Sequence, residues 1–526
     1  MIRKNLYTFF YFCLGFIVCN WGLFADTTEI KIPLPMQDQS VGQKEINLQT
    51  AIYMSLERNP QVVLRYLDVE TRQGQLQSAS GEFDWNTIIT TQANKTRSPS
   101  ITLSGAPDTL VEETISYTIG AIRKFRNGLS LTPSVSANLN NNSKSNPRNT
   151  SFAVYNLELL IPLLRGLGER SSRAIEASLE RDLEAARLAY LQVLSDQAFL
   201  TLDAYWRCAA ARVRVNLLSD LEKRAQTLIE TTEAMIEADL LSYSALPQAR
   251  ANLNDQRLLY VQALSEYAST RFDLASELGL EPDEMVNIPV PSTMIKKLDK
   301  ASDHVLKQDP HEFISLALTK RSDLLSARET LEARGILFTA AKVDLKPRLD
   351  LKLYTGYTTG NYEYKPIRVL QDNPRGANAG VALNFDWPWN NDFREGILVQ
   401  RRAEFDRANY LIYQLQQNIA RDTLQAAEIM KLDSTRALLS QDTVRQYKEA
   451  VDIASQRLAA GSASVFEVID MEGRYSRSTI QQINALRDYY ISVGRLRYVS
   501  GTIFQKLDSE EGYILNALDD SNIFAP

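Results

Sequence analysis

The sequence predicts a mainly α-helical fold that contains a smaller set of β-strands and is internally duplicated. Glycine and proline are scarce. Their 22 and 18 copies make up about 8% of the 526 residues, whereas they make up roughly 12% of an average chain. Few breakers in a long chain indicate long regular elements. Short segments of alternating polarity interrupt the helical stretches, and the same order of motifs occurs twice.

Residues 1–25 have the features of a secretory signal peptide. Arg3 and Lys4 supply positive charge, the following segment is almost wholly apolar, and Ala25 precedes the first acidic residue. We expect cleavage after Ala25, and an uncleaved anchor helix is the alternative. Lipidation of Cys19 stays open, although the residue just before it is not the small one that such a signal needs.

Loss of this leader changes the charge and the cysteine content of the chain. Removing Arg3 and Lys4 takes the net charge from −6 to −8, and Cys13 and Cys19 are lost as well. Cys208 then stands alone, so no internal disulfide is expected. No later run of 18 apolar residues occurs, so we expect no transmembrane helix after the leader.

Three segments alternate between apolar and polar residues, at 129–139, 349–353 and 379–387. Segments with one apolar and one polar face can be strands of a membrane barrel, with the apolar side towards lipid. They can also be strands of a soluble sandwich, with the apolar side towards a core. Alternation by itself favours the soluble sandwich.

Two stretches are nearly free of helix breakers. Between Glu169 and Leu278 the one breaker is Pro247, and between Ile397 and Ser500 there are three glycines and no proline. A helix from Glu169 to about residue 238 would hold some 70 residues, on the order of 105 Å in length. Apolar residues in it recur every three or four positions, as on a helix packed along another helix: Leu179, Leu183, Ala186, Tyr190 and Val193.

An internal repeat organises the chain. The offset between aligned motifs is 262 before the strand regions, 226 at their end and 222 through the long helices. The first copy therefore has the larger β insertion, and each copy reads helix, strands, long helix, turn, helix. The aligned positions are Asn59 with Arg321, Pro162 with Pro388, Asp239 with Gly461, and Gly279 with Gly501.

Composition and motifs argue against an enzyme or a nucleic-acid binder. A net charge of −6 gives no bulk positive charge for nucleic acid. The two histidines, His304 and His311, lie in a polar stretch, and the chain has no GxSxG, HExxH, CxxC or Gly-rich phosphate motif. We expect no catalytic residue, metal or cofactor.

Four motifs carry a resemblance to a known family. They are the opening from Ala51 to Pro60, PLLRG from Pro162, RLAAGSASVFEVID from Arg457, and the helix closing at Gly501. In this order the chain resembles the TolC-like outer-membrane efflux proteins (outer membrane factors), over roughly residues 46–504. The resemblance implies long antiparallel helical coiled coils, and β-strands that contribute to an outer-membrane barrel shared by a homotrimer.

The same resemblance implies a function and partners. Such a trimer is a channel-tunnel in the outer membrane of a Gram-negative-type (diderm) bacterium, with a periplasmic helical domain. It meets a periplasmic adaptor protein and an inner-membrane efflux pump or ABC transporter, for multidrug efflux or type I secretion. The alternative is a soluble periplasmic coiled-coil adaptor or scaffold without a pore, which would not explain the duplicated strands.

The number of strands in the first copy is unusual for the family. Two polar breaks with a tight turn between them predict four strands, where the family usually has two. The alternative is that the extra hairpin lies outside the shared barrel. The four predicted strands lie near residues 85–97, 114–125, 129–139 and 151–161.

These elements divide the chain into nine expected segments. Their order is the signal peptide (1–25), a strap and first helix (26–84), strands with enlarged loops (85–161), a long periplasmic helical hairpin (162–280), an inter-repeat equatorial linker (281–310), the first helix of the second repeat (311–346), its strands (347–388), its long hairpin (389–507) and a C-terminal tail (508–526).

Two acidic residues are the candidates for a selectivity site. Glu467 and Asp470 are three positions apart, so their carboxylates lie on one helix face. Alone they would be ordinary solvated residues. The resemblance implies that they line the constricted periplasmic mouth, where three copies would form two acidic rings. The matching positions of the first copy are Ala245 and Gln248, so the rings are not doubled.

The remaining candidate residues lie in the two helical turns and at two prolines. Some family members latch the closed mouth with a tyrosine and an arginine, and Leu458 and Ala463 replace them here. Pro162 and Pro388 are expected at strand-to-helix bends, where a missing N–H costs little. The residues expected to contact adaptor hairpins are Ala238, Asp239 and Leu240 in one turn, and Ala460, Gly461 and Ser462 in the other.

Overall fold

A computed structural model describes residues 45–101, 105–145, 147, 149–292, 310–361, 369–370, 376–506 and 513–515. The predicted leader, Cys19 and His304 lie outside the described residues, as do 293–309 of the expected linker and most of the expected C-terminal tail. The chain forms two units. In the smaller one, strands β9 (Phe504–Lys506) and β10 (Tyr513–Leu515) pair antiparallel. Everything below concerns the larger unit.

The order of elements repeats within this unit. Each copy has two short helices, then strands, then a pair of long helices. The first copy contains α2 (Leu48–Arg58), α3 (Pro60–Ser80), strands β2 to β5, a short α4 (Glu169–Ser172), α5 (Ala174–Glu237) and α6 (Ala245–Glu277). The second contains α7 (Pro310–Lys320), α8 (Ser322–Asp344), β7, β8, α10 (Asp392–Ala459) and α11 (Val465–Val499).

Two equivalent glycines show that the duplication extends to local geometry. Gly279 follows α6 with a φ of 67°, and Gly501 follows α11 with a φ of 71°. A Cβ on Gly279 would lie 2.7 Å from the carbonyl of Arg58, and one on Gly501 would lie 3.1 Å from the nitrogen of Arg321. In both copies, therefore, a left-handed glycine closes the long hairpin against the break between the two short helices.

The strands of both copies form one antiparallel sheet of six, in the order β2-β3-β4-β5-β7-β8. The pairing of β5 with β7 joins the two copies. The first two strands are longer than the sequence predicts, since the first ends at Ile101 and the second begins at Pro107. The six strands are β2 (Asn86–Ile101), β3 (Pro107–Lys124), β4 (Ser130–Asn142), β5 (Asn149–Pro162), β7 (Arg348–Asn361) and β8 (Gly376–Asp386).

The register gives this sheet one apolar and one polar face. Directly paired residues share a face, and the pairs Val135↔Tyr155 and Leu353↔Val381 define the side that we call the apolar face. Other residues on it are Ile119, Leu131, Leu139, Leu157, Leu159, Leu351, Leu383 and Phe385. The opposite side, the polar face, carries Thr118, Ser134, Ser136, Asn138, Asn156, Glu158, Lys352 and Asn384.

Much of the apolar face is exposed in the single chain. Val381, Leu383 and Phe385 are 61–69% exposed. At its far end Val369 packs against Ala137 and Ala153 and accepts a hydrogen bond from the Thr359 hydroxyl at 2.7 Å. A soluble sandwich strand would bury such residues in a core, so the sandwich alternative does not describe this sheet.

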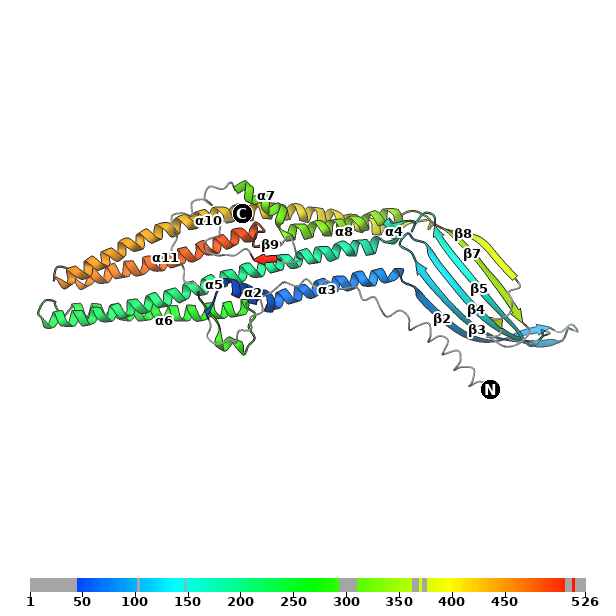
Figure 1. Cartoon of the computed structure of the whole chain (residues 1–526), viewed down its shortest axis with the longest axis horizontal. Coiled ribbons are helices and arrows are strands. Elements are labelled where there is room, and N and C mark those ends of the chain that lie inside the picture. Colours follow the sequence, from blue (N-terminus) through cyan, green and yellow to red (C-terminus); the bar gives the residue numbers. More distant parts are fainter. Residues whose placement is uncertain are drawn as a thin grey trace. The chain divides into compact units, whose positions relative to one another are not determined.

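The long helices form two antiparallel pairs, α5 with α6 and α10 with α11, which lie side by side (Figure 1). Helices α5 and α10 contain 64 and 68 residues, on the order of 100 Å each. Helix α8 packs against both α5 and α10, and α3 packs against α5. None of the helices in the described part combines the length and the apolar character that crossing a membrane requires.

One helix start differs from the prediction. The sequence predicts a single helix from Glu169, but Arg173 breaks it between α4 and α5 with φ −99° and ψ 2°. The guanidinium of Arg173 donates to Glu176 at 2.8 Å. The helical hydrogen bonds nevertheless continue through this turn, since the N–H of Arg173 donates to Glu169 O and that of Ala177 donates to Arg173 O, each at 2.9 Å. The absence of glycine and proline could not indicate this break.

Candidate functional site at the hairpin tips

The turn between α5 and α6 is closed by an unusual aspartate. Asp239 has a φ of 57°, and it is the one described residue other than glycine with a positive φ. The backbone N–H of Leu240 donates to Met235 O at 2.9 Å, and that of Asp239 donates to Ile236 O at 3.0 Å. These bonds form a Schellman motif, which needs a left-handed residue just after the helix. The predicted contact residues Ala238, Asp239 and Leu240 are all exposed.

The turn between α10 and α11 has the same geometry, and its left-handed position holds glycine, the residue that this conformation favours. Gly461 has a φ of 69°, and the N–H of Ser462 donates to Arg457 O at 2.9 Å. Helix α11 then begins with Ser464 as N-cap, whose hydroxyl accepts from the N–H of Glu467 at 3.2 Å. Ala460, Gly461 and Ser462 are exposed, like their counterparts in the first copy.

A buried apolar cluster lies beneath both turns. It joins residues from all four long helices, so the two tips form one packed unit. Leu458, at one position of the family latch, is 3% exposed within this cluster. Ala463, at the other position, packs against it. Both positions therefore serve apolar packing, and neither carries a polar group for a latch.

Both predicted acidic residues are paired with arginines of the same chain. Glu467 Oε1 lies 2.7 Å from Arg457 Nη1, and Asp470 Oδ2 lies 3.0 Å from Arg474 Nε. All four side chains are about one third to one half exposed. The two carboxylates share one end of α11, but their negative charge is offset by two nearby guanidinium groups.

Sequence reasoning missed several residues at the tips. Arg457 lies ten residues before Glu467, and Arg474 lies four residues after Asp470. The i,i+4 spacing of Arg474 from Asp470 could have indicated that pair. Tyr243 and Phe466 are 70% and 65% exposed. With Leu240, which is 64% exposed, they give the tips several exposed apolar side chains, and contiguous residues of this kind mark contact surfaces.

Glu472 is a further acidic residue near the tips. Burial raises its pKa above the ordinary 4.5, and the charge of Arg224 opposes part of this rise. Arg224 comes from α5 and lies 5.9 Å from the ring centroid of Tyr475. Glu472 therefore faces the neighbouring helical pair, whereas Glu467 and Asp470 lie at the exposed side.

The two prolines lie between strands and helices. Pro162 is the last residue of β5 and is buried, and Pro388 lies between the end of β8 and the start of α10. Near the first of these transitions the carboxylate of Glu176 is 3% exposed. It accepts from Arg126 at 2.6 Å, Arg173 at 2.8 Å and Ser80 at 2.9 Å. The hydrogen bond from Arg126 is the main reason that its pKa falls to about 2.

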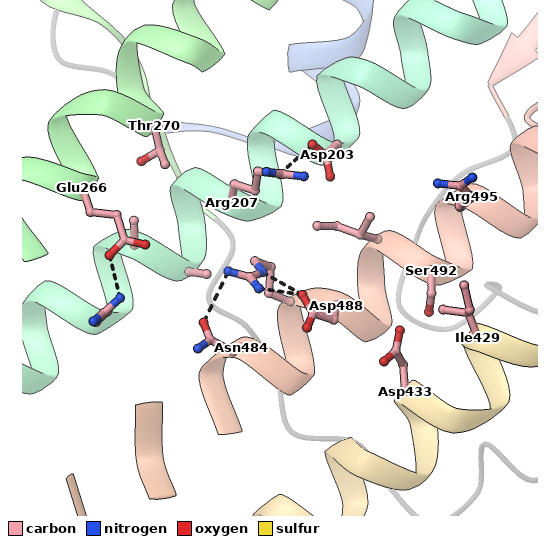
Figure 2. A pocket seen from close by; sticks show the side chains of 15 residues that line it. Asp203, Arg207, Glu266, Thr270, Ile429, Asp433, Asn484, Asp488, Ser492 and Arg495 are labelled. Atoms are coloured by element: carbon pink, nitrogen blue, oxygen red, sulfur yellow. Dashed lines mark hydrogen bonds and ion pairs between the residues drawn. The ribbon is translucent and has the colours of Figure 1, made fainter. Parts of the chain in front are cut away.

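A second candidate site is a polar pocket of about 350 Å³ lined by the long helices of both copies (Figure 2). Six of its eight charged side chains pair with one another. Arg207 lies 2.7 Å from Asp203, and Arg487 lies 2.7 Å from Asp488. Because these charges are already paired, we assign no ligand to the pocket. Across the described ranges, no group of three or more His, Cys, Asp or Glu residues is arranged for a metal ion.

The one cysteine of the described residues, Cys208, is buried in α5. Burial raises the pKa of its thiol to about 11. A thiol of this kind is inert, because the thiolate is the reactive form.

Comparison with known proteins gives one family match, over part of the chain, and several matches in fold. Residues 313–502 match the family described as outer membrane efflux protein. No curated protein matches the chain in sequence.

Solved structures match the architecture across most of the chain. The outer-membrane channel OprN is 15% identical with a TM-score of 0.64, and the match covers 90% of this chain and 99% of that one. VceC from Vibrio cholerae is 15% identical (TM-score 0.63; 86% and 96% covered). The Campylobacter jejuni channel CmeC is 14% identical (TM-score 0.63; 91% and 94% covered). The predicted mainly helical fold with an antiparallel sheet is confirmed, and so is the resemblance to the TolC-like outer-membrane efflux family.

Proposed function

We propose that the protein is a trimeric outer-membrane channel-tunnel that conducts substrates from a periplasmic adaptor and an inner-membrane pump to the cell exterior. The observation that carries this proposal is the six-stranded sheet, with one exposed apolar face and one polar face. A membrane barrel needs the apolar face towards lipid and the polar face towards a water-filled lumen. The family match and the solved channels support the same function.

Assembly follows from the edges of the sheet. β2 and β8 are the outermost strands, and each has one edge without a partner strand in the sheet. Open edges do not occur in hydrocarbon, because their N–H and C=O groups would lack hydrogen bonds. Copies of the chain must therefore complete one another, and the family resemblance implies three of them.

The helical pairs supply the periplasmic part of the proposed tunnel. At about 100 Å, α5 and α10 are long enough to extend far from the membrane. The exposed turns around Asp239 and Gly461 would then meet the adaptor, and Glu467 and Asp470 would line the mouth. The pump selects the cargo, so multidrug efflux and type I secretion both fit this channel.

Localisation and channel activity can be tested together. In a diderm host, the mature chain is expected in the outer-membrane fraction, extractable only with detergent and migrating on gels in a heat-modifiable manner. Reconstituted in planar bilayers, it should give discrete ionic conductance. A stable monomer that stays in solution without detergent would contradict the proposal.

A further inference from the structure

We propose that all six strands of each subunit form the wall of the shared barrel, with the β2 edge of one copy pairing with the β8 edge of the next. Three copies of a six-stranded sheet would then enclose the lumen with 18 strands. This inference rests on the proposed function. The alternative leaves the β2–β3 hairpin outside the wall, with four strands per copy.

The pairing of β4 supports the six-stranded wall. β4 pairs with β3 between Ser130 and Asn142 except at Thr132 and Pro133, and on its other side with β5 from Ser130 to Asn141. A strand has only two hydrogen-bonding edges. β4 therefore has no edge to offer to a neighbouring subunit, and the edges available for closure belong to β2 and β8.

The rows that define the two faces continue from β4 into the extra hairpin, although Ile88 and Ile122 lie on its polar face. Ile89 pairs with Ile119, which pairs with Val135, so this row lies on the apolar face. The next row is polar and contains Thr90, Thr118 and Ser136. A hairpin outside the barrel would have no reason to align its apolar residues with those of β4.

Charged residues mark a membrane-sized window on the hairpin. No charged residue occurs from Asn86 to Asn94 in β2 or from Thr114 to Ile122 in β3. Each window holds nine residues, and a tilted transmembrane strand needs about 9–11. The ion pair between Lys95 and Glu113 closes the window at one end, and Arg123 with Lys124 closes it at the other.

The directions of the two free edges are compatible with pairing. β2 follows the helices α2 and α3, so it runs away from the helical end, whereas β8 runs back towards α10 (Figure 1). Adjacent copies would therefore join antiparallel, as in all other pairs of the sheet. Pro99, which cannot donate to a neighbouring strand, lies beyond the uncharged window of β2.

The two models differ in what surrounds adjacent residues of β2. Ile88 and Ile89 lie on the polar and the apolar face, in the same rows as Ser134 and Val135 of β4. Single cysteines at these four positions can be introduced into a Cys208→Ala chain. The reconstituted trimer is then treated with a membrane-impermeant thiol reagent, and a fluorophore on each cysteine is tested for quenching by brominated lipid.

In the six-stranded wall, Ile89→Cys loses fluorescence in brominated lipid as Val135→Cys does, and Ile88→Cys reacts from water as Ser134→Cys does. Equal reaction from water and no lipid quenching at both β2 positions would overturn the six-stranded wall. If brominated lipid also fails to quench the fluorophore at Val135→Cys, the membrane barrel itself is contradicted.

Disulfide cross-linking tests the interface directly. Thr90 of β2 and Ser136 of β4 lie in one row, so they are matched probes for the edge that meets β8. Each is changed to cysteine together with Asn378→Cys, Ala382→Cys or Asn384→Cys on the polar face of β8. Gly380 is avoided, because a Cβ there would lie 2.2 Å from the Tyr354 hydroxyl.

We expect disulfide-linked dimers and trimers with Thr90→Cys and none with Ser136→Cys. The reverse result would overturn the six-stranded wall and leave the trimeric channel intact. If neither probe links two chains, the shared barrel is wrong and the proposed function fails with it.

Discussion

Arg457 on the last turn of α10 donates to Glu467 on the first turn of α11, with 2.7 Å between Nη1 and Oε1. The pair joins the two helices across the tip. Because both side chains are more than one third exposed, the contact contributes only about 0.2–1 kcal/mol to stability. Its larger effect is electrostatic, since the guanidinium lowers the negative potential that the carboxylate projects.

Removing both acidic charges should change ion selectivity. We expect the double variant Glu467→Gln with Asp470→Asn to shift the reversal potential in a salt gradient towards lower cation preference, because a ring of carboxylates attracts cations. Asp442→Asn is the control, since that residue forms a similar exposed pair with Arg445 away from the tip. An unchanged reversal potential in the double variant would remove these residues from the mouth.

Removing the arginine should have the opposite sign. Arg457→Gln leaves Glu467 unpaired, so we expect a higher cation preference and stronger block by divalent cations in planar bilayers. Arg457→Lys keeps the charge and should behave like the unsubstituted protein. If Arg457→Gln lowers cation preference, Glu467 does not face the conducting path.

The lowered pKa of Glu176 predicts that the protein loses stability in acid. Its folded pKa of about 2 lies below the ordinary 4.5, so its contribution is present above pH 4.5 and is lost as the pH falls towards 2. Glu176→Gln should destabilise the protein by about 2–3 kcal/mol at neutral pH, since it removes the charge of a buried carboxylate that accepts from two arginines. Thermal unfolding between pH 2 and 7 would show the two proteins converging in acid.

Glu180→Gln is the matched control for that experiment. Glu180 also pairs with Arg173, but its side chain is 42% exposed, and its loss should cost less than about 1 kcal/mol. Equal destabilisation by both substitutions would contradict the central role of Glu176.

Glu472 should respond to pH in the opposite direction. Burial raises its pKa above 4.5, so the folded state binds the proton more readily and stability falls as the pH rises above that value. Glu472→Gln should therefore raise the melting temperature at neutral pH, by less than Glu176→Gln lowers it, and have no effect in acid. Glu449→Gln, on the exposed surface of α10, should change nothing at either pH.

Gly279 and Gly74 should respond oppositely to alanine. Gly279 has a positive φ, and a Cβ would lie 2.7 Å from backbone atoms of Arg58, so Gly279→Ala should destabilise by more than about 1 kcal/mol. Gly74 lies within α3 with nothing within 4 Å of an added Cβ. Gly74→Ala should stabilise by about 0.5–1 kcal/mol. Denaturant unfolding of both variants in detergent would test the pair.

Local patterns were sufficient to predict the main elements of the fold. The scarcity of glycine and proline predicts α5 and α10, and alternating polarity predicts β4 and β8, because these signals lie within one element. The internal repeat adds the equivalence of Gly279 and Gly501, which the structure expresses as two similar backbone contacts.

Sequence patterns could not predict contacts between distant segments. Arg173 at the break contacts Glu176, which is also held by Arg126, 50 residues before it. The pairing of Arg457 with Glu467 depends on how tightly the turn between them closes. Such contacts leave no periodic trace in the sequence, so spacing could identify the carboxylates but not the guanidinium groups that offset them.

The unequal turns have a consequence for any protein that surrounds this end of the proposed trimer. Six loops would alternate there, three with the carboxylate of Asp239 and three with the bare backbone of Gly461. An encircling ring of six identical subunits would thus encounter two chemically distinct seats in alternation. Its members would meet a carboxylate at three positions and none at the other three, because duplication preserved the shape of the loop but not its charge.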